Sequence, residues 1–202
     1  MDTIKKPRCP EFNEALELLE KTCLNPTYFY GFNGCDFTKI QAEAKEIIRS
    51  MLVIFEAKDT DYAANGKPMG NLRSSEEVGV PAWKGTMIRI GDKKQRICSF
   101  AVRGSFQVED EKITDTLKDL ANYACIGKVL FMEVHPRGTF GYGYDVDKVL
   151  NDFLFLGVRA VHCLLLYKHQ SEIGGHGVKW NDQPLEDLKT HFDNIAAFAR
   201  SK

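Results

Sequence analysis

The sequence lacks the patterns that define several common classes of protein. No window approaches 18 continuous apolar residues, and no apolar segment follows the N-terminal lysines, so we expect neither a membrane-spanning helix nor a secretory signal. The six cysteines form no CxxC pair, and several fall in apolar periodic stretches. We therefore predict a cytoplasmic protein whose cysteines are reduced and structural.

An excess of charge of either sign is also lacking. The chain has 27 Lys and Arg against 28 Asp and Glu, which gives a formal net charge of −1. The cations are spread from end to end, whereas proteins that hold long nucleic acids gather them on one basic face. Stable binding to long nucleic acid is therefore disfavoured.

Several catalytic signatures are absent. The chain contains no P-loop GxxxxGK[ST] and no GxSxG, so Walker-type and serine-nucleophile routes have no support in the sequence. The five histidines form no HExxH, and the seven-residue spacing of His162 and His169 is typical of packing rather than zinc binding. The glycine stretch at 138–144 follows a helical pattern instead of the strand that a dinucleotide-binding loop requires.

What the chain does have is helical periodicity. Its 202 residues, 44% hydrophobic and 27% charged, suffice for one well-buried core, so we predict a single domain over 1–202. Apolar residues recur at helical spacing, and no convincing alternation typical of a strand is found, so the predicted fold class is all-α. The predicted helices cover 11–23, 37–58, 83–100, 108–132, 146–169 and 184–200.

Two connections are unusual. The segment 25–36 is rich in aromatic residues, Gly and Asn, which indicates an ordered loop packed on a neighbouring surface. The polar stretch 59–77 is long for a connection in a compact domain, which favours a functional loop. The helices at 83–100 and 108–132 are expected to be antiparallel, and the run at 158–167 has the length of a buried core helix.

An acidic row carries the clearest chemical hint. Glu111, Asp115 and Asp119 are spaced i, i+4 and i+8, which would align them along one helical face. Like charges at this spacing repel unless a cation neutralises them, and Mg²⁺ prefers hard oxygen ligands. An antiparallel pair would bring Asp92 opposite Asp115, so the four carboxylates predict a Mg²⁺ site.

Ordinary surface charge explains the same row. Lys112 and Lys118 stand among the carboxylates and compensate them locally. Charge runs usually form a solvated face, and composition alone favours that interpretation. Spacing does not decide between a metal site and a solvated face.

A second cluster, within 58–71, suits a nucleotide. A tyrosine ring can stack on a base, an asparagine can bind a base edge or a sugar hydroxyl, and a lysine can meet a phosphate. The residues concerned are Lys58, Asp61, Tyr62 and Asn71. The alternative is a turn built from Asp, Asn and Gly. The cations of the next helix are either phosphate ligands or surface charges: Arg89, Lys93 and Arg96.

The order of these motifs resembles a known family. The chain reads KxxDY from Lys58, an Asn at 71, PxWxGxxIRxxDKxxR over 81–96, and DExxxDTxxDLxNY over 110–123. This order resembles the nucleotide modification associated domain family, which is related to the MazG-like all-α nucleotide pyrophosphohydrolases. The resemblance covers about residues 45–130.

The resemblance implies a catalytic helical core over 37–132, with a C-terminal helical extension over 135–202. Such a core would bind a ribo- or deoxyribonucleoside triphosphate and, with Mg²⁺ or Mn²⁺, hydrolyse it to a monophosphate and pyrophosphate. The implied roles are nucleotide pool control or DNA base modification. The protein would act in the cytoplasm, and a phage-encoded protein would act in the cytoplasm of its host. MazG-like cores commonly dimerise, so a homodimer or higher homo-oligomer is expected.

The resemblance also implies roles for individual residues. The metal ligands would be Asp92, Glu111, Asp115 and Asp119, the first three also catalytic. The substrate would be bound by Lys58, Asp61, Tyr62, Asn71, Arg89, Lys93, Arg96 and Asn122. Lys112 and Arg89 stand at positions where the family pattern has acidic residues. Loss of these acids would remove metal ligands, so the alternative is a sensor or sequestering protein that binds a nucleotide without hydrolysing it. A helical interaction protein is the third reading, and the resemblance disfavours it.

Overall fold

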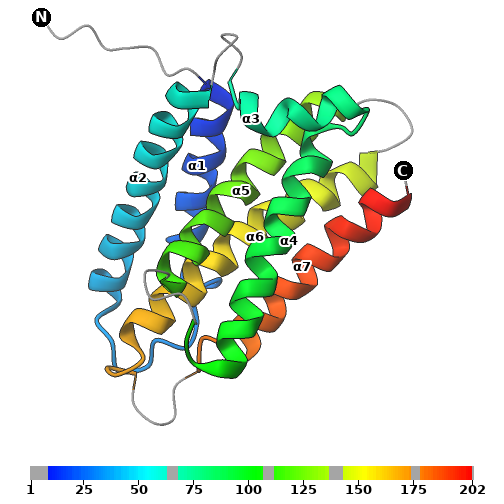
Figure 1. Ribbon diagram of the computed structural model, residues 1–202. Coiled ribbons are helices and arrows are strands. Elements are labelled where there is room, and N and C mark those ends of the chain that lie inside the picture. The colour runs from blue at the N-terminus through cyan, green and yellow to red at the C-terminus, as the bar shows by residue number, and fades with distance from the viewer. Residues whose placement is uncertain (1–8, 63–67, 107–111, 137–142, 174–177, 202) are drawn as a thin grey trace, which may run out of the picture.

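The structure is a computed structural model that describes residues 9–62, 68–106, 112–136, 143–173 and 178–201. This part of the chain contains helices and no strands, which confirms the all-α prediction (Figure 1). The elements are α1 (Pro10–Cys23), α2 (Phe37–Tyr62), α3 (Gly70–Arg73), the 3₁₀ turn η1 (Ser74–Val78), α4 (Ala82–Arg103), α5 (Ile113–Val134), α6 (Gly143–His169) and α7 (Gln183–Ser201).

The ends of the helices follow local sequence signals. Pro10 occupies the first turn of α1, where a missing N–H removes no hydrogen bond. Pro81 precedes α4, and Gly104 ends it with φ of 76°, a left-handed conformation that costs a glycine little. Each of the six predicted helices is present, with ends that differ by a few residues.

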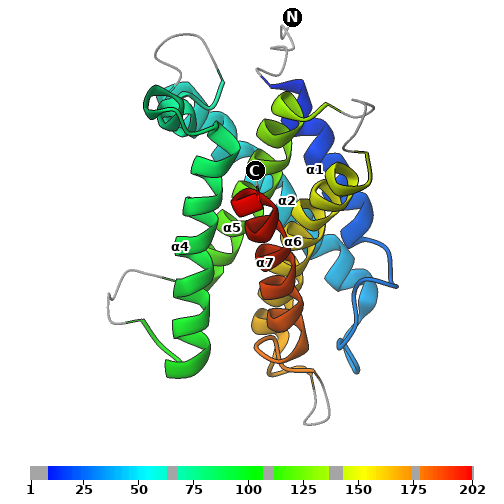
Figure 2. The ribbon, with the colours of Figure 1, turned by 90° about the vertical axis from the view of Figure 1, so that its right-hand side faces the viewer.

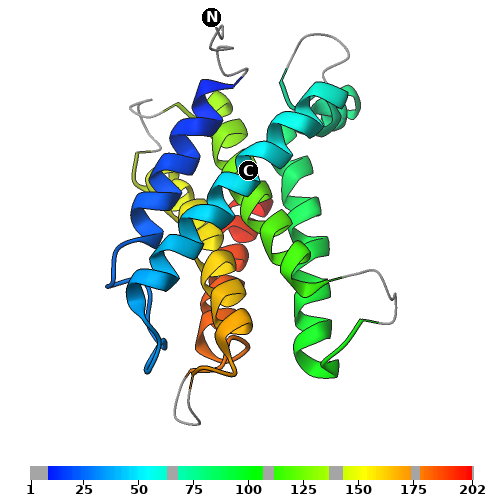
Figure 3. The same cartoon turned by 90° about the vertical axis from the view of Figure 1, so that its left-hand side faces the viewer.

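The helices form an antiparallel bundle with a second layer. α4, α5, α6 and α7 run alternately down and up beside one another, while α1 and α2 pack across α5 and α6 (Figures 1, 2 and 3). The predicted antiparallel pairing of 83–100 with 108–132 is confirmed. α5 contacts α1, α2, α4 and α6, and most of its side chains are therefore buried.

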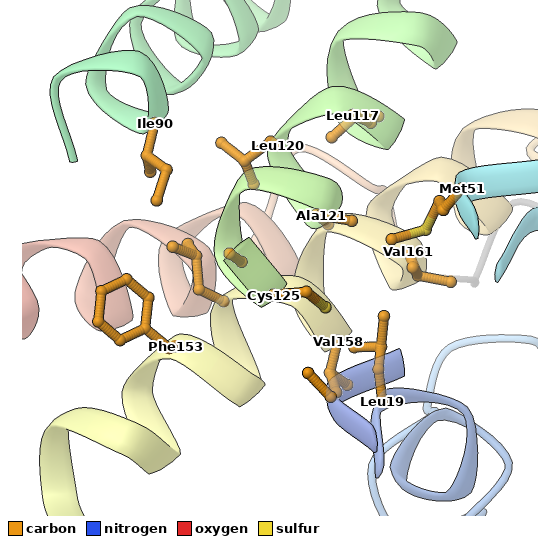
Figure 4. Packing of buried hydrophobic residues seen from close by; sticks show 14 of the residues in the cluster. Leu19, Met51, Ile90, Leu117, Leu120, Ala121, Cys125, Phe153, Val158 and Val161 are labelled. Atoms are coloured by element: carbon orange, nitrogen blue, oxygen red, sulfur yellow. The ribbon is translucent and has the colours of Figure 1, made fainter. Parts of the chain in front are cut away.

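The core is continuous across these layers. Side chains from α1, α2, α4, α5 and α6 meet in it, among them Leu19, Met51, Ile90, Leu120 and Val161 (Figure 4). Burying a side chain of this size contributes about 1.5–3 kcal/mol. Each helix therefore gains most of its stability from the neighbours that it packs against.

α5 and α6 approach each other closely at a glycine. A Cβ atom built on Gly127 would lie 2.5 Å from Cε1 of Phe153, which is a clash. A second glycine, Gly157, lies on α6 beside α1. A Cβ atom built on Gly157 would lie 3.1 Å from Cδ1 of Leu19, which is a tight contact. These two glycines set how near α6 lies to α5 and α1.

The prediction of one long loop over 59–77 is wrong. α2 continues to Tyr62, and the region after Pro68 folds into α3 and η1. Leu72 of α3 is buried, and it supplies the apolar contact that holds these short helical turns on the bundle.

The cysteine prediction is confirmed for the described residues. All six cysteines are free, and four of them are buried. Burial raises the pKa of Cys125 to about 12, and burial also raises the pKa of Cys9 to about 11. Thiols with such pKa values stay protonated and pack as small apolar side chains.

α6 is long and apolar enough to cross a membrane by length and composition, the one such helix in the described ranges. Of its most apolar window, 83% is buried inside the protein. That burial is typical of the central helix of a soluble bundle, and the predicted core helix at 158–167 lies within it.

The aromatic segment 25–36 packs on α6 and α7, as predicted. The Tyr30 hydroxyl donates to Asp187 at 3.0 Å, and Arg159 donates to the Tyr28 carbonyl at 2.7 Å. His162 lies beneath the segment, where its Nε2 donates to the Tyr30 carbonyl at 2.7 Å and its ring stacks on Phe29. Burial lowers the pKa of His162 from 6.5 to about 4.

This burial predicts a dependence of stability on pH. The unfolded chain binds a proton at His162 near pH 6.5 and the folded chain only near pH 4, so stability is full above pH 6.5 and falls between these values. The loss should reach up to about 3 kcal/mol. Urea unfolding of the wild type and of His162→Gln between pH 7.5 and 4.5 measures it. The wild type should lose more stability than the variant, and parallel pH profiles would contradict the assignment.

Candidate functional site

A small cavity lies where α2 ends and α3 begins, above α5. Its volume is about 40 Å³, which has room for a few waters or a hydrated ion but not for a nucleotide. α5 forms its floor because Asp119, Asn122, Tyr123 and Ile126 are spaced i, i+3, i+4 and i+7 and so share one face. The polar side chains around it are Lys58, Asp59, Asn71, Asp119 and Asn122.

Asp59 is the most unusual of these side chains. It is only 5% exposed, although it carries a carboxylate. Its Oδ1 accepts the backbone N–H of Met69 at 2.6 Å, and its Oδ2 is buried with no donor among the described residues. A buried carboxylate oxygen without a partner is costly, so it calls for a cation, a water or a ligand donor.

Met69 adopts a strained backbone to make that bond. Its φ is 61° and its ψ is 32°, and it alone among the described non-glycine residues has a positive φ. Left-handed conformations are uncommon for residues with a large side chain, and they gather at functional sites. The strain holds the Met69 N–H against Asp59 and thereby fixes the carboxylate beside the cavity.

Asn122 repeats the pattern on α5. It is 7% exposed, and its Oδ1 is buried with no donor among the residues that the structure describes. The two residues that carry these unpartnered oxygens, Asp59 and Asn122, thus line the same small cavity.

Asp119 connects three helices at the cavity. Its Oδ2 lies 2.7 Å from Nζ of Lys93 on α4, and its Oδ1 lies 3.6 Å from Nζ of Lys58 on α2. The Lys93 side chain is 19% exposed and the Asp119 side chain 27%, so this pair is shielded from solvent more than most surface pairs. With Asp59 counted, the two lysines balance the two carboxylates, and the ammonium groups of Lys58 and Lys93 are the donors here that an anion would meet.

The predicted site residues divide into two groups. Four line the cavity and a fifth reaches it through an ion pair: Lys58, Asn71, Asp119 and Asn122, with Lys93 bound to Asp119. The others in the described ranges do not line it: Asp61, Arg89, Asp92 and Asp115 are exposed, and Arg96 lies over the Phe106 ring. The side chain of Tyr62, and Glu111 as a whole, lie outside the described residues.

The predicted helical row of three carboxylates is described for two of its members. Asp115 and Asp119 lie on α5, which begins at Ile113 after an extended Lys112, with φ of −114° and ψ of 137°. Glu111 lies outside the described residues. Among the described residues, no three carboxylate, histidine or cysteine side chains gather into a metal-binding group.

The expected pairing of Asp92 with Asp115 stays a prediction. Both side chains are exposed, and neither lines the cavity. The ion pair that joins the antiparallel helices α4 and α5 beside the cavity is that of Lys93 with Asp119.

Sequence reasoning missed Asp59. A signal was present, because Met51, Phe55 and Asp59 recur at four-residue spacing and the first two belong to the buried stripe of α2. A carboxylate on the apolar stripe of an amphipathic helix must be buried or must end the helix. The predicted helix end at residue 58 hid this contradiction.

No protein-family model matches this chain, and searches of curated proteins and of solved structures find no similar protein. Functional inference therefore depends on the residues of the cavity and on the order of motifs in the sequence.

The contact between Asp59 and Met69 predicts different effects for two substitutions. Asp59→Ala removes the acceptor of a buried N–H and should lower the free energy of unfolding by about 1–3 kcal/mol. Asp59→Asn keeps an oxygen at that position and should cost clearly less. Urea unfolding of both variants at pH 7.5 compares them. Equal losses would show that the bond to Met69 does not position this side chain.

Proposed function

We propose that the protein is a Mg²⁺-dependent nucleoside triphosphate pyrophosphohydrolase, which converts a ribo- or deoxyribonucleoside triphosphate to a monophosphate and pyrophosphate. The observation that carries the proposal is the pair of buried, unpartnered oxygens of Asp59 and Asn122, in a cavity edged by two lysines. The motif resemblance over about residues 45–130 supports the same activity.

The oxygens at the cavity fit Mg²⁺. This ion commonly binds proteins through one or two carboxylates and completes its shell with water and substrate phosphates. Asp59 and Asn122 would hold it, and Mn²⁺ suits the same ligands. When bound, the ion would neutralise phosphate charge and polarise a phosphoryl oxygen.

The lysines give the triphosphate its position. Lys58 on α2 and Lys93 on α4 already face one carboxylate from two sides. Phosphate oxygens that arrive there meet two ammonium groups held in place, so little further ordering of the side chains is needed. Asn71, exposed on α3 at the edge of the cavity, can donate to the phosphates or to the sugar.

The direct test is product analysis with each common NTP and dNTP, with Mg²⁺ and with EDTA. We expect metal-dependent monophosphate and pyrophosphate from the wild type and at least a hundredfold loss, about 2.7 kcal/mol of transition-state stabilisation, in Asp59→Asn. Asp193→Asn is the matched control, because Asp193 is a paired surface carboxylate on α7. Intact nucleotides under every condition would refute the hydrolase.

A further variant separates two sets of carboxylates. If the exposed carboxylates that the sequence predicts, Asp92 and Asp115, contribute the metal ligands, Asp115→Asn should lose activity while Asp59→Asn keeps it. The cavity proposal expects the reverse, because Asp115 is exposed and does not line the cavity.

A nucleotide-binding sensor without turnover is the second candidate. Two observations favour it: Asp119 is held by two lysines, and no three acidic side chains gather among the described residues. Calorimetry would then detect nucleotide binding that Asp59→Asn weakens, with no product formed. The expected homo-oligomer stays a prediction, and Val53 on α2 and Ile88 on α4 are exposed apolar side chains that suit it.

A further inference from the structure

A second hollow lies beside the cavity and is much larger. Its volume is about 740 Å³, within the range of small-molecule pockets. It is bounded by the first turns of α1, the last turns of α5, and the chain from Pro68 to Arg73. Neither the motifs nor the proposed metal site uses it.

The groove adjoins the cavity. Met69, the strained residue bonded to Asp59, lines both hollows. The floor of both is one face of α5, since Asn122, Ile126 and Val129 follow each other at helical spacing. Asn122 and Val129 are about 10 Å apart along the helix axis, a distance that a nucleotide bridges between its phosphates and its base.

The charges of the two hollows differ. Glu11, Glu14 and Glu133 line the groove with Arg73 and Lys128, and Arg73 is held by Glu133 at 2.7 Å. This excess of acids repels phosphate. At the cavity, by contrast, Lys58 and Lys93 balance Asp59 and Asp119, so a ligand that spans both hollows would turn its phosphates toward the cavity.

The walls of the groove suit a base and a sugar. Ala15 and Leu18 of α1 face it from one side, and Val129 and Met132 of α5 line it from the other, which provides apolar surface for a planar ring. Lys128 is only 8% exposed, and its Nζ lies 4.0 Å from the sulfur of Met132, which also lines the groove. The Glu14 carboxylate offers an acceptor for base or sugar hydrogens.

We infer that this groove binds the nucleoside moiety of the nucleotide whose phosphates face the cavity of Asp59 and Asp119. The inference rests on the proposed function, and it adds where the base binds and which way round the substrate lies. Met69 then lies between the nucleoside and the metal-binding oxygens.

Two substitutions fill the groove without touching the cavity. Leu18→Trp on α1 and Met132→Trp on α5 change side chains that are 37% and 36% exposed, so both variants should fold. Val102→Trp is the matched control, because Val102 is 88% exposed on α4 and does not line the groove. For the preferred triphosphate we expect KM to rise at least about tenfold in both groove variants, with kcat little changed. Unchanged KM in both would overturn the inference.

Nucleosides alone separate this inference from the hydrolase. Calorimetry with each common nucleoside and deoxynucleoside should show binding that Leu18→Trp and Met132→Trp abolish and that Asp59→Asn keeps. That result supports the groove even if no triphosphate is hydrolysed. If triphosphates are hydrolysed while no nucleoside binds or inhibits, the groove is not the nucleoside site, and the hydrolase proposal is unaffected.

Discussion

The candidate site depends on the carboxylate of Asp119. Within the described residues α2 and α4 do not pack on each other, and both lie against α5. Asp119 pairs with Lys58 of α2 and with Lys93 of α4, so one side chain of the central helix bridges the two flanking helices. The cavity lies beside this bridge. A change in the register of α4 and α5 would separate the lysines, and the positive edge of the cavity would disappear.

The neighbouring side chains show features that folding stability alone does not favour. A left-handed Met69, a buried Asp59 oxygen and a buried Asn122 oxygen each cost free energy, and all three meet at one place. Buried polar atoms without a hydrogen-bond partner also occur away from the cavity, at Trp83 and Asp152. Among the described residues the cavity differs in that two such oxygens and a left-handed backbone meet there, and strained backbone of this kind gathers at functional sites.

The sequence predicted the fold well, because helical periodicity and proline and glycine signals are local. It predicted the site in part. Lys58, Asn71, Asp119 and Asn122 line one cavity, whereas Asp92 and Asp115 are exposed and do not line it. Helical periodicity predicts the faces of a single helix, but which side chains of α2, α4 and α5 meet depends on tertiary contacts such as the ion pair of Lys93 with Asp119. The groove joins α1, α3 and α5, so no single segment of sequence could reveal it.

The central claim is that the oxygens of Asp59 and Asn122 hold a divalent cation together with a nucleotide. The most direct measurement is a Mg²⁺ titration followed by NMR at the Met69 backbone amide, which is bonded to Asp59, and at the Asn122 side-chain amide. The account expects saturable shifts at both groups in the wild type, tighter in the presence of a non-hydrolysable triphosphate and absent in Asp59→Asn. Shifts confined to residues near Asp92 and Asp115, with Met69 and Asn122 unchanged, would contradict it.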